Sequence, residues 1–183
     1  MSRYNIDFTF IARLEGGPAT RGYVPDAANS RSGVTIATGF DLGQRHLQDL
    51  QSLGLGAGLV QRLSPYLGLI GQQAAARLAQ QPLTVSAAEA EAIDEAFKRP
   101  FIERLAAAYT KAGGGDFGAL PAPAQTVIAS VAFQYGDLAS RTPNFWKQVV
   151  AHDWAAACAN LQNFGDRYAT RRRQEAALLG SLL

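Results

Sequence analysis

Four side chains in the first quarter of the chain are of the types that acid-catalysed glycoside hydrolysis uses. Glu15, Asp26 and Asp41 carry carboxyl groups, and Thr35 lies between the two aspartates. The reaction needs one carboxylic acid to protonate the leaving oxygen and a second carboxylate, or a water that it orients, at the anomeric carbon. A threonine hydroxyl beside a carboxylate can hold that water. Each aspartate alone is more often a turn or capping residue, so Asp26 and Asp41 are alternatives for the second carboxylate.

The general acid needs an element that ends at Glu15. Apolar residues recur at helical spacing over residues 5–14, and Asn5 can cap a short helix there. Gly16 and Gly17 then end the helix and leave Glu15 at its C-terminus. The partial negative charge of a helix C-terminus favours a protonated carboxyl group, as a general acid requires. A surface glutamate at a helix end would show the same pattern.

Residues 18–44 change character, because Gly, Pro, Asn, Ser and Thr dominate them. Val34 and Ile36 alternate with small or polar neighbours, which is typical of a strand. We therefore expect loops around a small antiparallel sheet, with GVTIATGFDLG at residues 33–43 as its best strand. In that geometry Thr35 and Asp41 could face one cleft with Glu15.

From about residue 46 the pattern is helical. Breaks are predicted at Gly54, Gly56 and Gly58, and a new turn at Ser64-Pro65. Ser86 and Glu89 form a capping box for a helix over 86–99, and Pro100 is expected to kink or end it. Helical periodicity continues over residues 101–112, 124–135, 143–150, 152–162 and 167–179.

These elements predict a mainly α, α+β fold with two lobes. We expect a single domain over residues 1–183, with a helix and a small antiparallel sheet lobe in about 1–60 and a larger helical lobe in about 61–183.

Other chemistries find less support in the sequence. His46 and His152 are far apart and neither has metal-ligand spacing around it, so no metal is expected. No G-x-S-x-G elbow or P-loop occurs. Cys158 lies in an alanine-rich helical run and is predicted to be a small core residue. The aromatic residues Phe145, Trp146 and Trp154 are also predicted to lie in the core.

The charge pattern argues against nucleic acid as a partner, because the net charge is only +2. The basic cluster at Arg167 and Arg171 to Arg173 can be a solvated helix face or a binding patch. No apolar run is long enough for membrane insertion. Charged residues interrupt the N-terminal stretch, so we expect synthesis in the cytoplasm without a signal peptide.

Several segments resemble one family in the same order. Residues 14–16 (LEG) and 33–43 are similar to the catalytic region of the phage-type lysozymes, as in T-even phages, where a glutamate followed by glycine ends the first helix. The segment 83–97 looks like the start of the middle helices of those enzymes, and the segment 127–136 looks like their central helix. The run from 145 to 161 and the arginine-rich stretch at 167–173 resemble their last helices.

Within that superfamily, SGVTIATGFDLGQ looks closest to the pesticin-like branch, which includes bacteriocin domains and muramidase domains of type VI secretion effectors. The resemblance implies a phage-lysozyme-like fold and a catalytic set of Glu15, Thr35 and Asp41. The T-even phage pattern has its aspartate before the threonine, which corresponds to Asp26 here. The family also places an arginine of the last helical segment, one of Arg171 to Arg173, near the catalytic glutamate.

The resemblance implies a muramidase that cleaves the β-1,4 bond between N-acetylmuramic acid and N-acetylglucosamine in peptidoglycan glycan strands. No cofactor is implied. Tyr23, Asp26, Gln134 and Arg172 are expected to bind substrate, although an interhelical core contact is the alternative for Gln134 and Tyr135.

The biological setting that follows is the periplasm or cell wall of a target bacterium. The chain is expected to act as a monomer and as an antibacterial effector, an endolysin or a toxin domain. An immunity protein or secretion machinery would be a further partner. A non-catalytic peptidoglycan-binding module of the same fold and a helical protein–protein interaction domain are the alternative functions.

Overall fold

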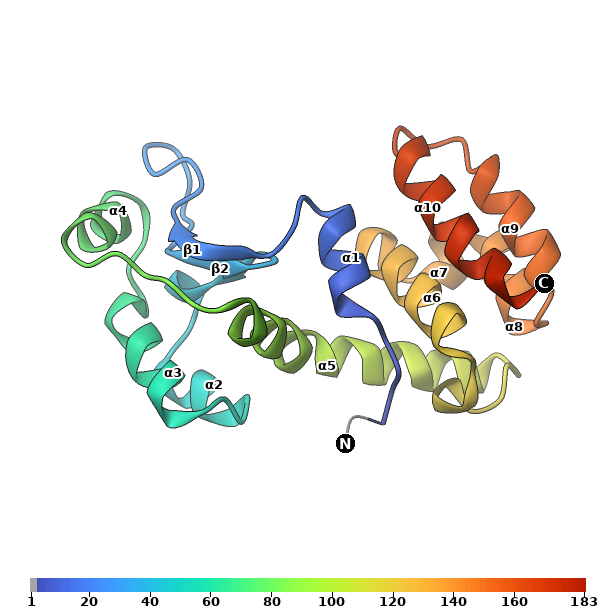
Figure 1. Cartoon of the computed structure of the whole chain (residues 1–183), viewed down its shortest axis with the longest axis horizontal. Coiled ribbons are helices and arrows are strands. Elements are labelled where there is room, and N and C mark those ends of the chain that lie inside the picture. The colour runs from blue at the N-terminus through green and yellow to red at the C-terminus, as the bar shows by residue number, and fades with distance from the viewer. Residues whose placement is uncertain (1–2) are drawn as a thin grey trace. The chain divides into compact units, whose positions relative to one another are not determined.

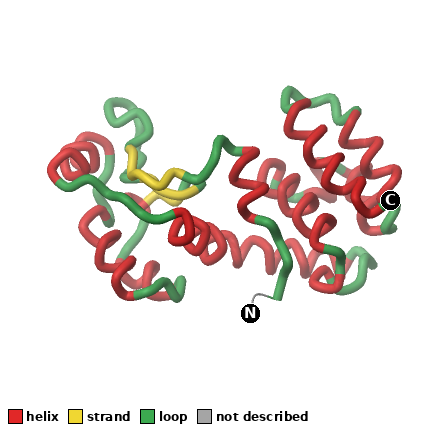
Figure 2. Tube along the Cα trace, viewed as in Figure 1, coloured by secondary structure: helices red, strands yellow, loops and turns green. Residues whose placement is uncertain are grey.

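The computed structural model describes residues 3–183 and is mainly helical with a small antiparallel sheet (Figure 1), as the sequence predicts. All strands lie within residues 19–41, and helices and their connecting loops make up the chain beyond them (Figure 2). The chain forms two compact units. We call residues 12–99 the sheet unit, and residues 3–11 together with residues 100–183 the helical unit.

The sheet has three strands, β1 (Ala19–Tyr23), β2 (Thr35–Ala37) and β3 (Phe40–Asp41), in the order β1-β2-β3. The segment expected to be one strand is therefore a hairpin, because Ile36 pairs with Phe40 and the three residues between them turn the chain. Gly39 supplies the backbone conformation that this turn needs, with a φ of +92°.

The sheet unit has its own hydrophobic core. Helices α2 (Leu47–Ser52), α3 (Ala57–Leu63), α4 (Gly71–Gln80) and the first half of α5 (Ala87–Lys111) supply apolar side chains to it. Ile36 and Phe40 are fully buried in this core. Since successive strand residues point to opposite faces, their neighbours Thr35 and Asp41 face away from it.

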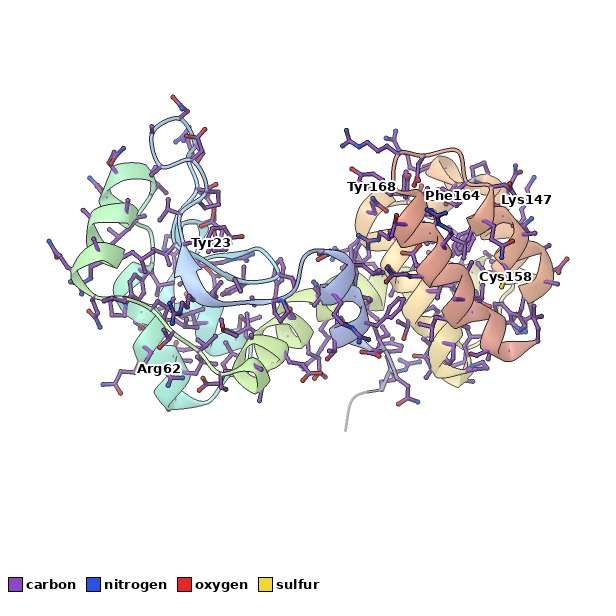
Figure 3. The ribbon with its side chains drawn as sticks, turned by 45° about the horizontal axis from the view of Figure 1, so that its top comes forward. Tyr23, Arg62, Lys147, Cys158, Phe164 and Tyr168 are labelled. Atoms are coloured by element: carbon purple, nitrogen blue, oxygen red, sulfur yellow. The ribbon has the colours of Figure 1, made fainter. Side chains whose placement is uncertain are left out.

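The helical unit is built around α6 (Ala122–Tyr135), whose residues from Ala124 to Ala132 are all buried. Around it lie the second half of α5, α7 (Leu138–Arg141), α8 (Pro143–Val150), α9 (Trp154–Gln162) and α10 (Ala169–Leu179). Phe145, Trp146 and Trp154 pack in or against this core, as predicted. Cys158, labelled in Figure 3, is 7% exposed and is the small core residue that the sequence indicated.

Most helix boundaries follow the sequence, but the first helix begins later than predicted. Helix α1 (Phe8–Leu14) is capped by Asp7, whose Oδ1 accepts from the Phe10 N–H at 2.7 Å. Asn5 instead lies before the helix, and its N–H donates to Gln125 Oε1 at 2.9 Å.

One predicted helix breaker does not break a helix, because Gly58 lies inside α3, whereas Gly54 and Gly56 lie outside the helices. Helix α5 runs continuously through Pro100, so of the two predicted effects, a kink and an end, the end does not occur. The capping box at its start is confirmed, because Ser86 N donates to Glu89 Oε2 at 2.8 Å and Glu89 N donates to Ser86 Oγ at 3.1 Å.

The two lobes also divide at a different place from the prediction. Residues 61–99 were expected in the helical lobe, but Leu63, Tyr66 and Ile93 are buried in the core that covers the sheet. Within residues 3–183, no helix has the length and apolar character that crossing a membrane requires.

Candidate active site

Glu15 lies at the C-terminal end of α1, where the sequence placed it. The Gly17 N–H donates to Ala12 O at 2.8 Å and the Gly16 N–H to Arg13 O at 3.3 Å, which is the Schellman pattern of helix termination. Gly16 has a φ of +95°, which a residue with a side chain rarely adopts. The side chain of Glu15 is 30% exposed. The glycine pair therefore fixes the point at which this carboxyl group leaves the helix.

Three predicted site residues form one row across the sheet. Tyr23 on β1 is paired with Thr35 on β2, and Thr35 is paired with Asp41 on β3. Directly opposed residues of antiparallel strands point to the same face with their Cβ atoms about 5 Å apart. Thr35 is 4% exposed, whereas Tyr23, labelled in Figure 3, is 44% exposed. The row thus combines a phenol, a hydroxyl and a carboxylate on the sheet face opposite Ile36 and Phe40.

Asp41 is held by backbone groups on both sides of the hairpin. Its Oδ1 accepts from Gly33 N at 2.9 Å and from Gly43 N at 2.8 Å. Among the described residues, no hydrogen bond uses Oδ2. Thr35 Oγ1 donates to Gly33 O at 3.3 Å, so the hydroxyl and the carboxylate are both fixed at Gly33. This arrangement leaves one oxygen of a rigidly held carboxylate able to orient a water.

Asp26 has a different environment from Asp41. It lies in the exposed loop between β1 and β2 with a φ of +42°. Its Oδ1 accepts from the backbone N–H of Asn29 at 3.2 Å and from the Asn29 side chain at 3.0 Å. These contacts are those of a turn aspartate. They favour Asp41 over Asp26 as the second carboxylate.

Sequence reasoning missed a group of three polar residues, Thr38, Asp94 and Lys98, of which Lys98 contacts Glu15. Lys98 on α5 places its Nζ 3.9 Å from Glu15 Oε2 and donates to Thr38 Oγ1 at 2.6 Å. Asp94, one turn earlier on α5, accepts from the Thr38 hydroxyl at 2.6 Å and from the Thr38 N–H at 3.1 Å. Asp94 and Lys98 are 1% and 7% exposed. The available signal was two charged residues four apart on the apolar face of a helix.

Residues 5–155 match the family named Pesticin and described as a bacterial toxin homologue of phage lysozyme, C-terminal. The chain belongs to this family. Comparison with curated proteins found no match. The fold and the family agree with the expectation of a phage-lysozyme-like pesticin domain.

The helical unit of this pesticin-family chain holds the other two predicted substrate-binding residues, Gln134 and Arg172. Arg172 is 1% exposed, donates to Gln134 Oε1, and forms ion pairs with Glu175 at 2.6 Å and Asp166 at 3.3 Å. Tyr135 donates to Asp166 Oδ2 at 2.6 Å. These contacts connect α6 to α10 and the loop before it, so both α6 residues make the interhelical contacts given as the alternative. Substrate binding by Gln134 and Arg172 stays a prediction.

The arginine cluster is therefore not a uniformly solvated face. Arg171 donates to Ser130 O at 3.1 Å and pairs with Glu175 at 3.1 Å, whereas Arg167 and Arg173 are exposed. Desolvation by burial raises the pKa of Glu175, and the guanidinium groups of Arg172 and Arg171 oppose that rise. Over residues 3–183, no group of three or more His, Cys, Asp or Glu could hold a metal ion.

Proposed function

We propose that this pesticin-family chain is a muramidase that hydrolyses the β-1,4 bond between N-acetylmuramic acid and N-acetylglucosamine. The observation that carries the proposal is that one unit holds Glu15 at a helix end and the Thr35–Asp41 pair on the adjoining sheet. This is the two-carboxylate set that glycoside hydrolysis requires. Family membership supports peptidoglycan as the polymer, since the family is described as a homologue of phage lysozyme.

In this mechanism each group has one task. Glu15 donates its proton to the glycosidic oxygen as the bond to the anomeric carbon breaks. Asp41 Oδ2 and the Thr35 hydroxyl hold the water that attacks that carbon, and the Asp41 carboxylate takes a proton from this water as the new bond forms. Asp41 can do this without moving because its Oδ1 is held by Gly33 and Gly43. Tyr23 offers an exposed ring beside them as a surface for a sugar.

The first test removes the acid. Glu15→Gln keeps the size of the side chain and cannot donate a proton as a carboxylic acid, so we expect lysis to fall by at least about 100-fold with folding unchanged. Purified sacculi are digested with wild type and variant, and the fragments are reduced and weighed by mass spectrometry. Glu103→Gln, on the exposed side of α5, is the matched control.

The products decide the reaction class. Fragments with reducible muramic-acid ends, absent for Glu15→Gln, support the proposal. Fragments with anhydro ends would identify a lytic transglycosylase and remove the water-activating role of Asp41. Binding to sacculi without any released fragment would favour the non-catalytic module instead.

A second pair of variants distinguishes the two aspartates. Asp41→Asn is expected to lower the rate at least about 100-fold, because an amide cannot take a proton from water. Asp26→Asn is expected to keep most of the activity, since an asparagine side-chain oxygen still accepts the Asn29 hydrogen bonds. The reverse ranking would assign the role to Asp26.

A further inference from the structure

Lys98 is an ammonium group placed where a lysine is costly. It is 7% exposed, and lysine side chains are almost never fully buried unless they are paired. Its Nζ contacts the Thr38 hydroxyl at 2.6 Å and lies 3.9 Å from Glu15 Oε2. Its position therefore ties the end of α1 to the β2–β3 turn.

The direction of this contact is fixed by Asp94. The Thr38 hydroxyl donates its only proton to Asp94 Oδ1 at 2.6 Å, so its lone pairs are left to accept from Lys98. Asp94 also accepts from the Thr38 N–H at 3.1 Å. Since Asp94 and Lys98 are four residues apart on α5, one helix face supplies both charges. The ammonium is thus anchored at one side and faces Glu15 at the other.

Lys98 makes a contact beyond the hairpin turn that it helps to hold. Asp94 alone makes two hydrogen bonds to the hairpin turn, which is enough to hold the turn on α5. An apolar side chain at position 98 would avoid the cost of desolvating a buried ammonium. The ammonium also lies 3.9 Å from Glu15 Oε2, and an apolar side chain could not make this ion pair.

We propose that Lys98 is a positioning residue for Glu15, an inference that rests on the proposed muramidase function. By attracting Oε2 from 3.9 Å, the ammonium limits the rotation of the carboxyl group that donates the proton to the glycosidic oxygen. The Asp94 carboxylate behind Thr38 offsets part of the positive charge. Lys98 itself touches neither the sugar nor the water, and acts only through Glu15.

The test compares three lysine variants on soluble, uncross-linked glycan chains. Lys98→Met keeps the length of the side chain and removes the charge, and we expect kcat to fall about 10- to 100-fold with KM within about 2-fold. Lys98→Arg restores a cation that can donate to Thr38, and should recover most of the lost kcat. Lys111→Met, an exposed lysine near the end of the same helix, is the matched control and should behave as wild type.

Folding is followed for each variant by circular dichroism, because a structural role would lower stability and would raise KM as well. If Lys98→Met does not fold, Thr38→Val carries the same test, because it keeps Lys98 and removes the hydroxyl that anchors it. A folded variant of either kind with wild-type kcat would overturn the inference, as would a loss that Lys98→Arg fails to recover. A wild type that releases no fragments would instead contradict the proposed function.

Discussion

At the scale of single residues, hydrogen bonding distinguishes the two candidate aspartates better than their position in the sequence. Asp26 and Asp41 both accept two hydrogen bonds with Oδ1. For Asp26 the donors come from one nearby residue in an exposed loop, whereas for Asp41 they come from the two ends of a buried hairpin. A carboxylate held from both sides keeps its direction, which is what orienting a water demands.

Sequence could predict that Glu15 ends a helix and that Thr35 lies on a strand, because each belongs to a short local pattern. The catalytic roles of Glu15, Thr35 and Asp41 stay predictions. The glycine pair after Glu15 and the alternation around Thr35 are visible within a few residues. Lys98 and Thr38 are 60 residues apart, and no local rule connects them. Only the packing of α5 against the hairpin turn brings them together.

Because the Tyr109 side chain is buried, we expect the folded protein to lose stability at alkaline pH. Its ring is fully buried in the helical unit and its hydroxyl donates to Val149 O at 3.0 Å. Desolvation raises the pKa of Tyr109 to about 12 from 10.0, so its stabilising contribution is complete below pH 10 and is lost as the pH rises through about 12. By pH 11 the folded state should have lost on the order of 1 kcal/mol at this site.

The measurement is the free energy of unfolding in urea at pH 7 and pH 11, for wild type and Tyr109→Phe. The variant lacks the hydrogen bond to Val149 and should be about 1 kcal/mol less stable at pH 7. That gap should close at pH 11, because phenylalanine has no proton to lose. A gap of equal size at both pH values would show that Tyr109 does not titrate in this way.

At the scale of elements, the hairpin depends on a close approach of two glycines. A Cβ on Gly43 would lie 2.6 Å from both Gly33 Cα and Leu69 O, which are backbone atoms that cannot give way. The same two glycines supply the N–H groups that hold Asp41. We therefore expect Gly43→Ala to lower the free energy of unfolding by about 2 kcal/mol or more and to reduce activity with it.

A glycine without such contacts is the control for Gly43. Gly58 lies inside α3 and a Cβ there meets nothing within 4 Å. Gly58→Ala should stabilise the protein by about 0.5–1 kcal/mol through helix propensity. Thermal unfolding of both variants checks the pair. Equal shifts in Tm for the two variants would contradict the idea that the close contact between Gly33 and Gly43 requires glycine at position 43.

Helix ends show where local rules succeed and where they fail. The Ser86–Glu89 capping box and the Gly16 stop are complete within a few residues, and both were predictable. The start of α1 was not, because tertiary contacts decide it. The N–H groups of Asn5 and Asp7 donate to Gln125 and to Thr126 Oγ1 on α6. With Asn5 held there, Asp7 becomes the residue that caps the helix.

At the scale of the whole molecule, two hydrophobic cores share one long helix. The first half of α5 supplies Ala90 and Ile93 to the core of the sheet unit, and the second half supplies Ile102 and Leu105 to that of the helical unit. Sequence periodicity showed both halves as helical but could not show that each half faces a different core. That is why the expected boundary at about residue 60 was misplaced.

The change between units falls at Pro100, within α5. Proline has no N–H, so the carbonyl of Ala96 loses its helical partner at this turn. Pro100→Ala should restore that hydrogen bond and raise the free energy of unfolding by about 1–3 kcal/mol, which is a few degrees in Tm. Pro123→Ala is the matched control, because Pro123 lies in the first turn of α6, where proline is tolerated and no bond is lost. If Pro100→Ala instead lowers Tm while Pro123→Ala leaves it unchanged, the two cores require the local geometry that proline imposes on α5, and the missing hydrogen bond is the smaller effect.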